Sequence, residues 1–147
     1  MKTNLQKPKW GVKTEWVPIE QLPPTPSGIK EIAIDLETKD PRLRTHGPGW
    51  PTGNGDVVGI AVAYEGFNAY LPFAHEGGGN LDRGIVLRWF QKEIANHPAD
   101  KIFYNAAYDV GWLRRLDVDL KGRWIDVMLG APLLNENRFS FSLNTVA

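Results

Sequence analysis

Two carboxylates separated by one residue stand at the end of a strongly apolar segment. Asp35 and Glu37 close the sequence Ile-Ala-Ile-Asp-Leu-Glu, which begins at Ile32. Alternate side chains of a strand point to the same face, so the two carboxylates share one face and the apolar residues share the other. Neighbouring like charges on a strand are destabilising without a compensating partner. Hard divalent cations with oxygen ligands supply that compensation, so the spacing predicts a metal-binding strand end.

A second acidic residue occupies a comparable position further along the chain. Asp109 closes the sequence Asn-Ala-Ala-Tyr-Asp, directly after the short apolar segment 101–104. Strand ends are where the sites of α/β sheets gather, so neighbouring strands would bring the three carboxylates together. Such a cluster would bind two Mg²⁺ or Mn²⁺ ions about 4 Å apart, which generate hydroxide and stabilise charge at phosphorus. The pattern predicts metal-dependent phosphodiester hydrolysis by Asp35, Glu37 and Asp109.

Each motif taken alone has a plainer interpretation. An Asp-x-Glu sequence at a strand end is common, Asp109 could be an ordinary exposed helix residue, and Asn105 could simply satisfy a turn. The occurrence of two such motifs, each behind an apolar strand, favours a functional site. Zinc is not indicated, because the chain has no cysteine and its three histidines are scattered.

The segments around these motifs predict an α/β protein with a mixed sheet flanked by helices. Strands are expected at 31–36, 57–64, 68–73, 101–104 and 123–125, and helices at 81–96, 107–116, 127–134 and from 139 onward. The first three strands form an antiparallel meander, and the later alternation of helices and strands is typical of parallel pairing. Asn80 and Asp126 are expected to cap the helices that follow them.

Length and composition are those of one globular domain. The chain has 147 residues, of which 42% are hydrophobic and 23% charged. Residues 1–28 contain several prolines and are expected to form an extended lead-in, with Trp10 and Trp16 packing part of it on the body. Residues 29–147 form the domain. No run approaches the ~20 apolar residues of a membrane span, and no signal peptide is present, so a cytoplasmic location without membrane contact is expected.

The formal net charge is zero, so a basic footprint for nucleic acid is only local. Basic residues follow the first carboxylates at 39–44 and follow Asp109 at 114–115. Two interpretations stay open, a contact with nucleic acid and an ordinary solvated face.

Three segments resemble motifs of the DEDD superfamily of 3′–5′ exonucleases. The sequence Asp-Leu-Glu-Thr from Asp35 to Thr38 resembles the first motif, and residues 105–109 resemble the second, with its Asn, aromatic residue and Asp. Asp126, at the head of a helical segment, resembles the next block. Over about residues 29–147 the chain is most similar to the proofreading domain of a family A DNA polymerase of the kind found in bacteriophages.

The resemblance implies a ribonuclease-H-like fold and a role for each matching residue. The three carboxylates named above would bind the two Mg²⁺ or Mn²⁺ ions. Thr38 and Asn105 would position the terminal nucleotide, and Tyr108 would lie beside the substrate strand. The implied substrate is the 3′ end of single-stranded DNA, and the implied partner is the polymerase domain of the parent protein.

The resemblance also implies an incomplete site. The third motif of the superfamily places Tyr or His four residues before an Asp. Asp117, Asp119 and Asp126 are preceded at that spacing by Leu113, Arg115 and Gly122. The chain is therefore expected to be a C-terminally incomplete domain with little or no activity. Two other functions stay open, an exoribonuclease similar to ribonuclease D and a non-catalytic module that binds single-stranded nucleic acid.

Overall fold

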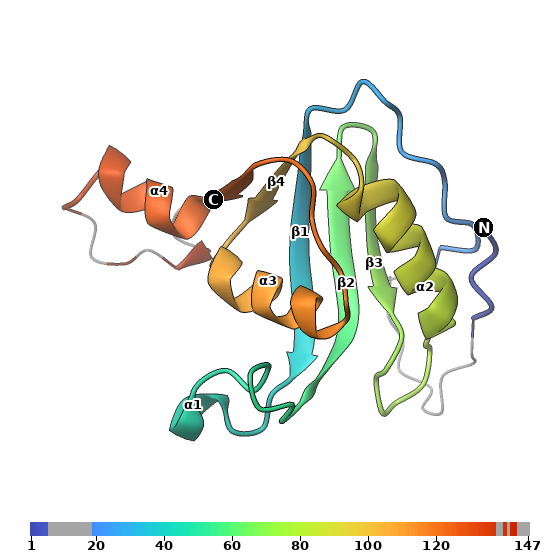
Figure 1. Cartoon of the computed structure of the whole chain (residues 1–147), viewed down its shortest axis with the longest axis horizontal. Coiled ribbons are helices and arrows are strands. Elements are labelled where there is room, and N and C mark those ends of the chain that lie inside the picture. The colour runs from blue at the N-terminus through green and yellow to red at the C-terminus, as the bar shows by residue number, and fades with distance from the viewer. Residues whose placement is uncertain (6–18, 138–139, 141, 144–147) are drawn as a thin grey trace.

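The computed structural model describes residues 1–5, 19–137, 140 and 142–143. Its strands are β1 (Glu31–Lys39), β2 (Asp56–Tyr64), β3 (Phe67–Pro72), β4 (Asp100–Phe103) and β5 (Trp124–Asp126). Its helices are α1 (Leu43–His46), α2 (Arg83–Trp89), the π-helix η1 (Phe90–Ala95), α3 (Ala106–Arg115) and α4 (Val127–Leu134). Helices α2 and α3 lie across one face of the sheet (Figure 1).

The five strands form one mixed sheet in the order β3-β2-β1-β4-β5. Strands β1, β2 and β3 pair antiparallel, whereas β4 pairs parallel to both β1 and β5. The predicted α/β class, with a meander followed by parallel strands, is confirmed. Strand β1 is central, so the strand that carries Asp35 and Glu37 is the direct neighbour of the strand that precedes Asp109.

Strand β1 contributes an apolar face to the core, because apolar and polar or exposed residues alternate along it. Ile32, Ile34 and Leu36 are buried, whereas Asp35 and Glu37 between and beyond them are exposed. The buried face joins a cluster that includes apolar residues of α2, η1 and α3. Burial of this face fixes the register of β1, because a slip of one residue would turn the carboxylates into the core.

Several predicted boundaries are wrong for identifiable reasons. Strand β1 runs three residues past the predicted end, since its pairing with β2 continues as far as Lys39. The helix predicted from residue 81 begins at Arg83 and is capped by Asp82, whose side chain accepts from the Ile85 N–H at 2.9 Å. The predicted cap, Asn80, instead accepts from the N–H and donates to the carbonyl of His75. An Asn and an Asp two residues apart are both good caps, and the loop geometry selects the second.

The cap predicted at Asp126 is confirmed, with its side chain accepting from the Met128 N–H at 3.0 Å. The loop that follows β1 contains the short helix α1, which was not predicted. Most of the helix expected from residue 139 onward lies outside the described residues.

The described part of the lead-in packs against α2 and η1. Trp89 Nε1 donates to the Pro23 carbonyl at 2.6 Å, and the Thr25 N–H donates to Glu93 at 3.0 Å. Leu22 is buried in the core. Trp10 and Trp16, expected to pack on the body, lie outside the described residues. None of the described helices is long and apolar enough to cross a membrane.

A buried lysine fixes the start of β4. Lys101 is fully buried, and its Nζ donates to the carbonyls of His97, Ala99 and Lys121 at 2.7, 2.8 and 2.8 Å. Three carbonyls compensate the buried charge, although burial lowers the pKa of Lys101. This side chain joins the loop before β4 to the loop before β5.

Candidate functional site

The end of β1 extends past its parallel neighbour. The pairing of β1 with β4 ends at Ala33 opposite Ile102, whereas the pairing with β2 continues to Lys39. The segment that carries Asp35 and Glu37 therefore has β2 on one side only. A register shift between Glu37 and Thr38 marks a bulge or irregularity at this point. Bulges of this kind are over-represented near active sites, where they re-aim side chains.

Asp109 lies in the first turn of α3 and faces this strand end. Its side chain is only 3% exposed, which overturns the interpretation as an ordinary exposed helix residue. Burial and the charge of Asp35 raise the pKa of Asp109 to about 7, with smaller contributions from Asp126 and Glu37. The backbone N–H of Leu36 opposes the rise.

The backbone N–H of Leu36 acts on both Asp35 and Asp109. It lowers the pKa of each carboxyl, although partial burial leaves the pKa of Asp35 raised as well. The two carboxylates therefore concentrate negative charge beside one peptide group. Glu37 contributes to the field at Asp109, so both predicted carboxylates of β1 act on the predicted carboxylate of α3.

These carboxylates are not gathered into a closed group. Among the residues that the structure describes, no three His, Asp or Glu side chains are placed together in a way that would hold a metal ion. Oxygen donors of this kind suit Mg²⁺ or Mn²⁺, which keep water and substrate oxygens among their ligands. The donor set therefore fits such an ion chemically, but the protein alone does not complete its coordination.

Asp126 positions the helix that carries Asp109. Its two carboxylate oxygens accept from the backbone N–H groups of Asn105 and Ala106 at 3.0 and 2.8 Å. Asn105 has a left-handed backbone with φ of 68°, and the carboxylate holds this bend where α3 begins. The same side chain caps α4, so it joins the starts of two helices. This second role was not predicted, because it depends on the parallel pairing of β4 with β5.

Thr38 and Tyr108, both predicted to contact substrate, are brought together. Their hydroxyl oxygens lie 2.7 Å apart, and the Tyr108 hydroxyl also donates to Asp40 Oδ2 at 3.2 Å. Asp40 Oδ2 accepts in addition from the Gly49 N–H at 2.9 Å. Asp40 was not predicted as part of the site, and it fastens the loop after β1 to α3.

A cavity of about 430 Å³ opens between this loop and the start of α3. It is lined by Leu43, Pro48, Trp50, Asn105, Ala107 and Tyr108. The ring of Trp50 packs closely against α3 at Gly111, where an added side-chain carbon would lie 2.4 Å from it. Trp50 and Tyr108 therefore give this cavity aromatic walls, and Asn105 adds a polar amide.

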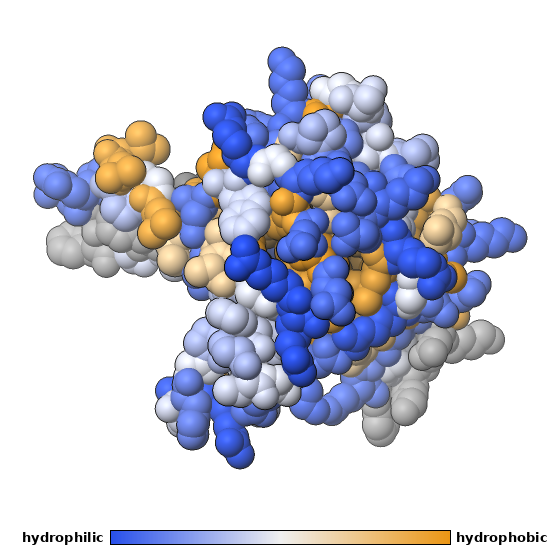
Figure 2. Space-filling model, in the orientation of Figure 1, coloured by the Kyte–Doolittle hydropathy of each residue, from blue (hydrophilic) through white to orange (hydrophobic). Residues whose placement is uncertain are grey.

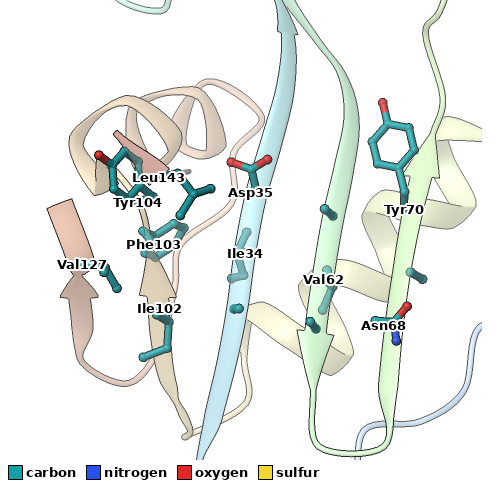
Figure 3. A pocket seen from close by; sticks show the side chains of 14 residues that line it. Ile34, Asp35, Val62, Asn68, Tyr70, Ile102, Phe103, Tyr104, Val127 and Leu143 are labelled. Carbon is teal, nitrogen blue, oxygen red and sulfur yellow. The ribbon is translucent and has the colours of Figure 1, made fainter. Parts of the chain in front are cut away.

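A second hollow, of about 450 Å³, lies on the opposite face of the sheet (Figure 3). Its floor is made of alanines from β1, β2 and β3, and Asp35, Tyr70 and Tyr104 are among its walls. Apolar side chains also gather on α4, which projects from the body (Figure 2). There Leu129, Leu133 and Leu134 are 66%, 88% and 91% exposed.

Comparison with known proteins finds similarity to a DNA polymerase. The chain is 36% identical to the DNA-directed DNA polymerase of Pseudomonas phage M6. The similarity extends over 141 residues and 92% of the chain, which spans only 21% of the length of that polymerase. No family model matches the chain. The similarity thus concerns a segment of a much larger protein and includes all the candidate site residues.

Proposed function

We propose that this chain is the 3′–5′ exonuclease domain of a DNA polymerase and hydrolyses the terminal phosphodiester of single-stranded DNA. The observation that carries the proposal is the placement of Asp35, on the central strand β1, beside the buried Asp109 of α3, whose pKa the charge of Asp35 raises. Similarity to a phage DNA polymerase over most of the chain supports the proposal that the parent protein is a DNA polymerase. The order and direction of the strands support a ribonuclease-H-like fold.

Under this proposal, Asp35, Glu37 and Asp109 hold two Mg²⁺ or Mn²⁺ ions together with oxygens of the substrate. When bound, the ions supply a hydroxide nucleophile and stabilise the charge that builds on phosphorus. Asp126 sets the position of Asp109, because it holds the first residues of α3.

The cavity beside α3 is the proposed place for the DNA strand. Asn105 offers both donors and acceptors to a terminal nucleotide, and Tyr108 and Trp50 offer aromatic surface. Stacking of a base on an aromatic side chain contributes about 1–3 kcal/mol and tolerates every base, as a proofreading site requires. Thr38 reaches this cavity through its contact with the Tyr108 hydroxyl.

The test uses this chain, Mn²⁺ and single-stranded DNA labelled at its 5′ end. We expect slow shortening from the 3′ end, which Asp35→Ala abolishes. Asp119→Asn is the control, because Asp119 is exposed in the irregular segment between α3 and β5 and the substitution removes the same charge. Cleavage that survives Asp35→Ala would show that the candidate site is not responsible. A matched RNA strand separates this activity from that of an exoribonuclease.

A non-catalytic module that binds single strands is the second candidate. One observation favours it, since the described residues contain no closed group of metal ligands. Binding of single-stranded DNA that needs no metal, with no shortening at any Mn²⁺ concentration, would support this function instead. Asp35→Ala should then leave binding unchanged or strengthen it, because one negative charge near the strand is removed.

A further inference from the structure

Tyr70 shares a face of the sheet with the candidate carboxylates. Asp35 on β1 is opposite Ala61 on β2, which is in turn opposite Tyr70 on β3. Directly opposite residues point to the same face, and neighbouring strands are about 4.8 Å apart, so the Cα atoms of Asp35 and Tyr70 are about 10 Å apart. Only a methyl group lies between them in this row. Figure 3 shows Asp35 and Tyr70 around the same hollow.

The ring of Tyr70 leans toward the next row of the sheet. That row places Glu37 opposite Gly59, with Pro72 on the far strand. A side-chain carbon at Gly59 would lie 2.2 Å from the Tyr70 hydroxyl oxygen and 2.6 Å from Cζ. The phenol therefore rests on the bare backbone of the residue that pairs with Glu37. Any larger residue at position 59 would displace it.

His75 holds the phenol from the other side. The Tyr70 hydroxyl and His75 Nε2 are 2.5 Å apart, and the two rings meet edge to face. His75 is fixed in turn by Asn80, which binds its N–H and its carbonyl at 2.8 and 2.7 Å. Asn80 is itself buried. The site described above makes no use of this arrangement.

The phenol stays neutral beside the carboxylates. Burial, together with the charges of Glu37 and Asp35, raises the pKa of Tyr70 to about 12. A neutral hydroxyl can accept a hydrogen bond from an imidazole N–H and at the same time donate one outward. A neutral donor at this place can bind an anionic oxygen of a nucleotide that the ions on the carboxylates do not reach.

Building on the function proposed above, we propose that Tyr70 binds the terminal nucleotide and that His75 positions Tyr70. The Tyr70 hydroxyl accepts a hydrogen bond from His75 Nε2 and donates one to an oxygen of a nucleoside 5′-monophosphate or of the equivalent residue of a strand. Together they form the β3 side of the carboxylate site, opposite α3.

The test measures binding of deoxythymidine 5′-monophosphate in the presence of Mg²⁺. Tyr70→Phe should weaken binding about fivefold to tenfold, as expected for one lost hydrogen bond to an anion. Tyr64→Phe is the control, because Tyr64 stacks on Phe67 in the same sheet and loses the same atom. His75→Phe should weaken binding by a smaller factor, since Tyr70 keeps its place over Gly59.

A spectroscopic measurement separates this role from a merely structural one. Addition of the nucleotide should shift the imidazole nitrogen resonances of His75 in the unaltered chain and in Tyr64→Phe, but not in Tyr70→Phe. Metal-dependent binding that Asp35→Ala abolishes and Tyr70→Phe leaves unchanged would overturn this inference alone. If the unaltered chain binds no nucleotide with Mg²⁺, this inference and the proposed function are both overturned.

Discussion

The hydroxyl oxygens of Thr38 and Tyr108 lie 2.7 Å apart, although 70 residues separate them along the chain. This contact joins the end of β1 to the first turn of α3, the two elements that carry the candidate carboxylates. A hydrogen bond at this place fixes the distance between the two halves of the site.

The energy of this contact can be measured with a double-mutant cycle. Thr38→Val and Tyr108→Phe should each lower the free energy of unfolding by about 1 kcal/mol. The double variant should lose less than the sum, because the first substitution already breaks the bond. Urea denaturation of the four proteins gives the coupling energy. Thr38→Val combined with Tyr64→Phe is the control, and additive losses in both cycles would contradict the contact.

The stability of the protein without metal should depend on pH through Asp109. Its pKa is raised from 3.8 to about 7 in the folded state, so the folded protein holds this proton more tightly than the unfolded chain. The resulting stabilisation is complete below about pH 4 and is lost as pH rises to about 7. At about 1.4 kcal/mol per pKa unit it amounts to at most about 4 kcal/mol, less where water screens the carboxylate.

Asp109→Asn isolates this contribution. The variant should be more stable than the unaltered chain at pH 8, and the difference between the two should shrink toward pH 4. Asp119→Asn, exposed and outside the site, should follow the unaltered chain throughout. Urea denaturation at pH 4 to 8 supplies the comparison, and parallel profiles for Asp109→Asn and the unaltered chain would contradict the raised pKa.

Binding of Mn²⁺ should be weak, and its affinity should depend on the protonation of Asp109. The described residues form no closed group of ligands, so we expect a dissociation constant near 1 mM, or about 4 kcal/mol. Because Asp109 must lose its proton, binding should tighten about tenfold per pH unit below pH 7. Calorimetric titration at pH 6 and 8 tests this, with Asp109→Asn as the variant that should show no such dependence. Micromolar binding would mean that a further residue completes the site.

Lys101→Met should be strongly destabilising. The substitution preserves the apolar stem but leaves the carbonyls of His97, Ala99 and Lys121 without their donor. At roughly 1–3 kcal/mol for each buried group left unpaired, we expect a loss of about 3 kcal/mol or more. Lys121→Met, at an exposed side chain, should change stability by less than about 0.5 kcal/mol. Equal losses for the two variants would show that the charge is not needed.

Gly111→Ala should change stability through two opposing effects, a better helix propensity and a clash with Trp50. Alanine in a helix gains up to about 1 kcal/mol over glycine, but its methyl group would lie 2.4 Å from the ring of Trp50. Overpacking against a rigid ring costs about 1–3 kcal/mol, so a net loss is expected together with a shifted tryptophan emission. Gly130→Ala in α4 has nothing within 4 Å and should be neutral or stabilising. A more stable Gly111→Ala variant would show that the Trp50 ring moves aside at little cost in free energy.

Local patterns in the sequence predicted those parts of the fold that depend on neighbours along the chain. The period of two in β1 placed Asp35 and Glu37 on one face, because burial of alternate residues fixes that face. The cap at Asp126 was predicted from its place before an apolar segment. Residue types therefore sufficed for the class of the fold and for the antiparallel meander of its first three strands.

Contacts between distant segments could not be predicted in this way. The bonds from Asn105 and Ala106 to Asp126 exist only because β4 and β5 lie side by side. The position of Tyr70 over Gly59 depends on the register of β2 with β3, which no local pattern specifies. Both arrangements surround the predicted carboxylates, so the sequence indicated the acidic residues and not what holds them.

The central place of β1 has a consequence for protein synthesis. The meander of β1, β2 and β3 is complete at Pro72, but the parallel neighbour of β1, β4, starts only at Asp100. At about 5–20 residues per second, the meander waits roughly 1–6 s for the chain from 72 to 100 to emerge. During that time one edge of β1 is unpaired and open to association with other chains. The newly made chain therefore passes through an interval in which Asp35 and Glu37 lie on a strand with an open edge, where charged side chains discourage pairing with other chains.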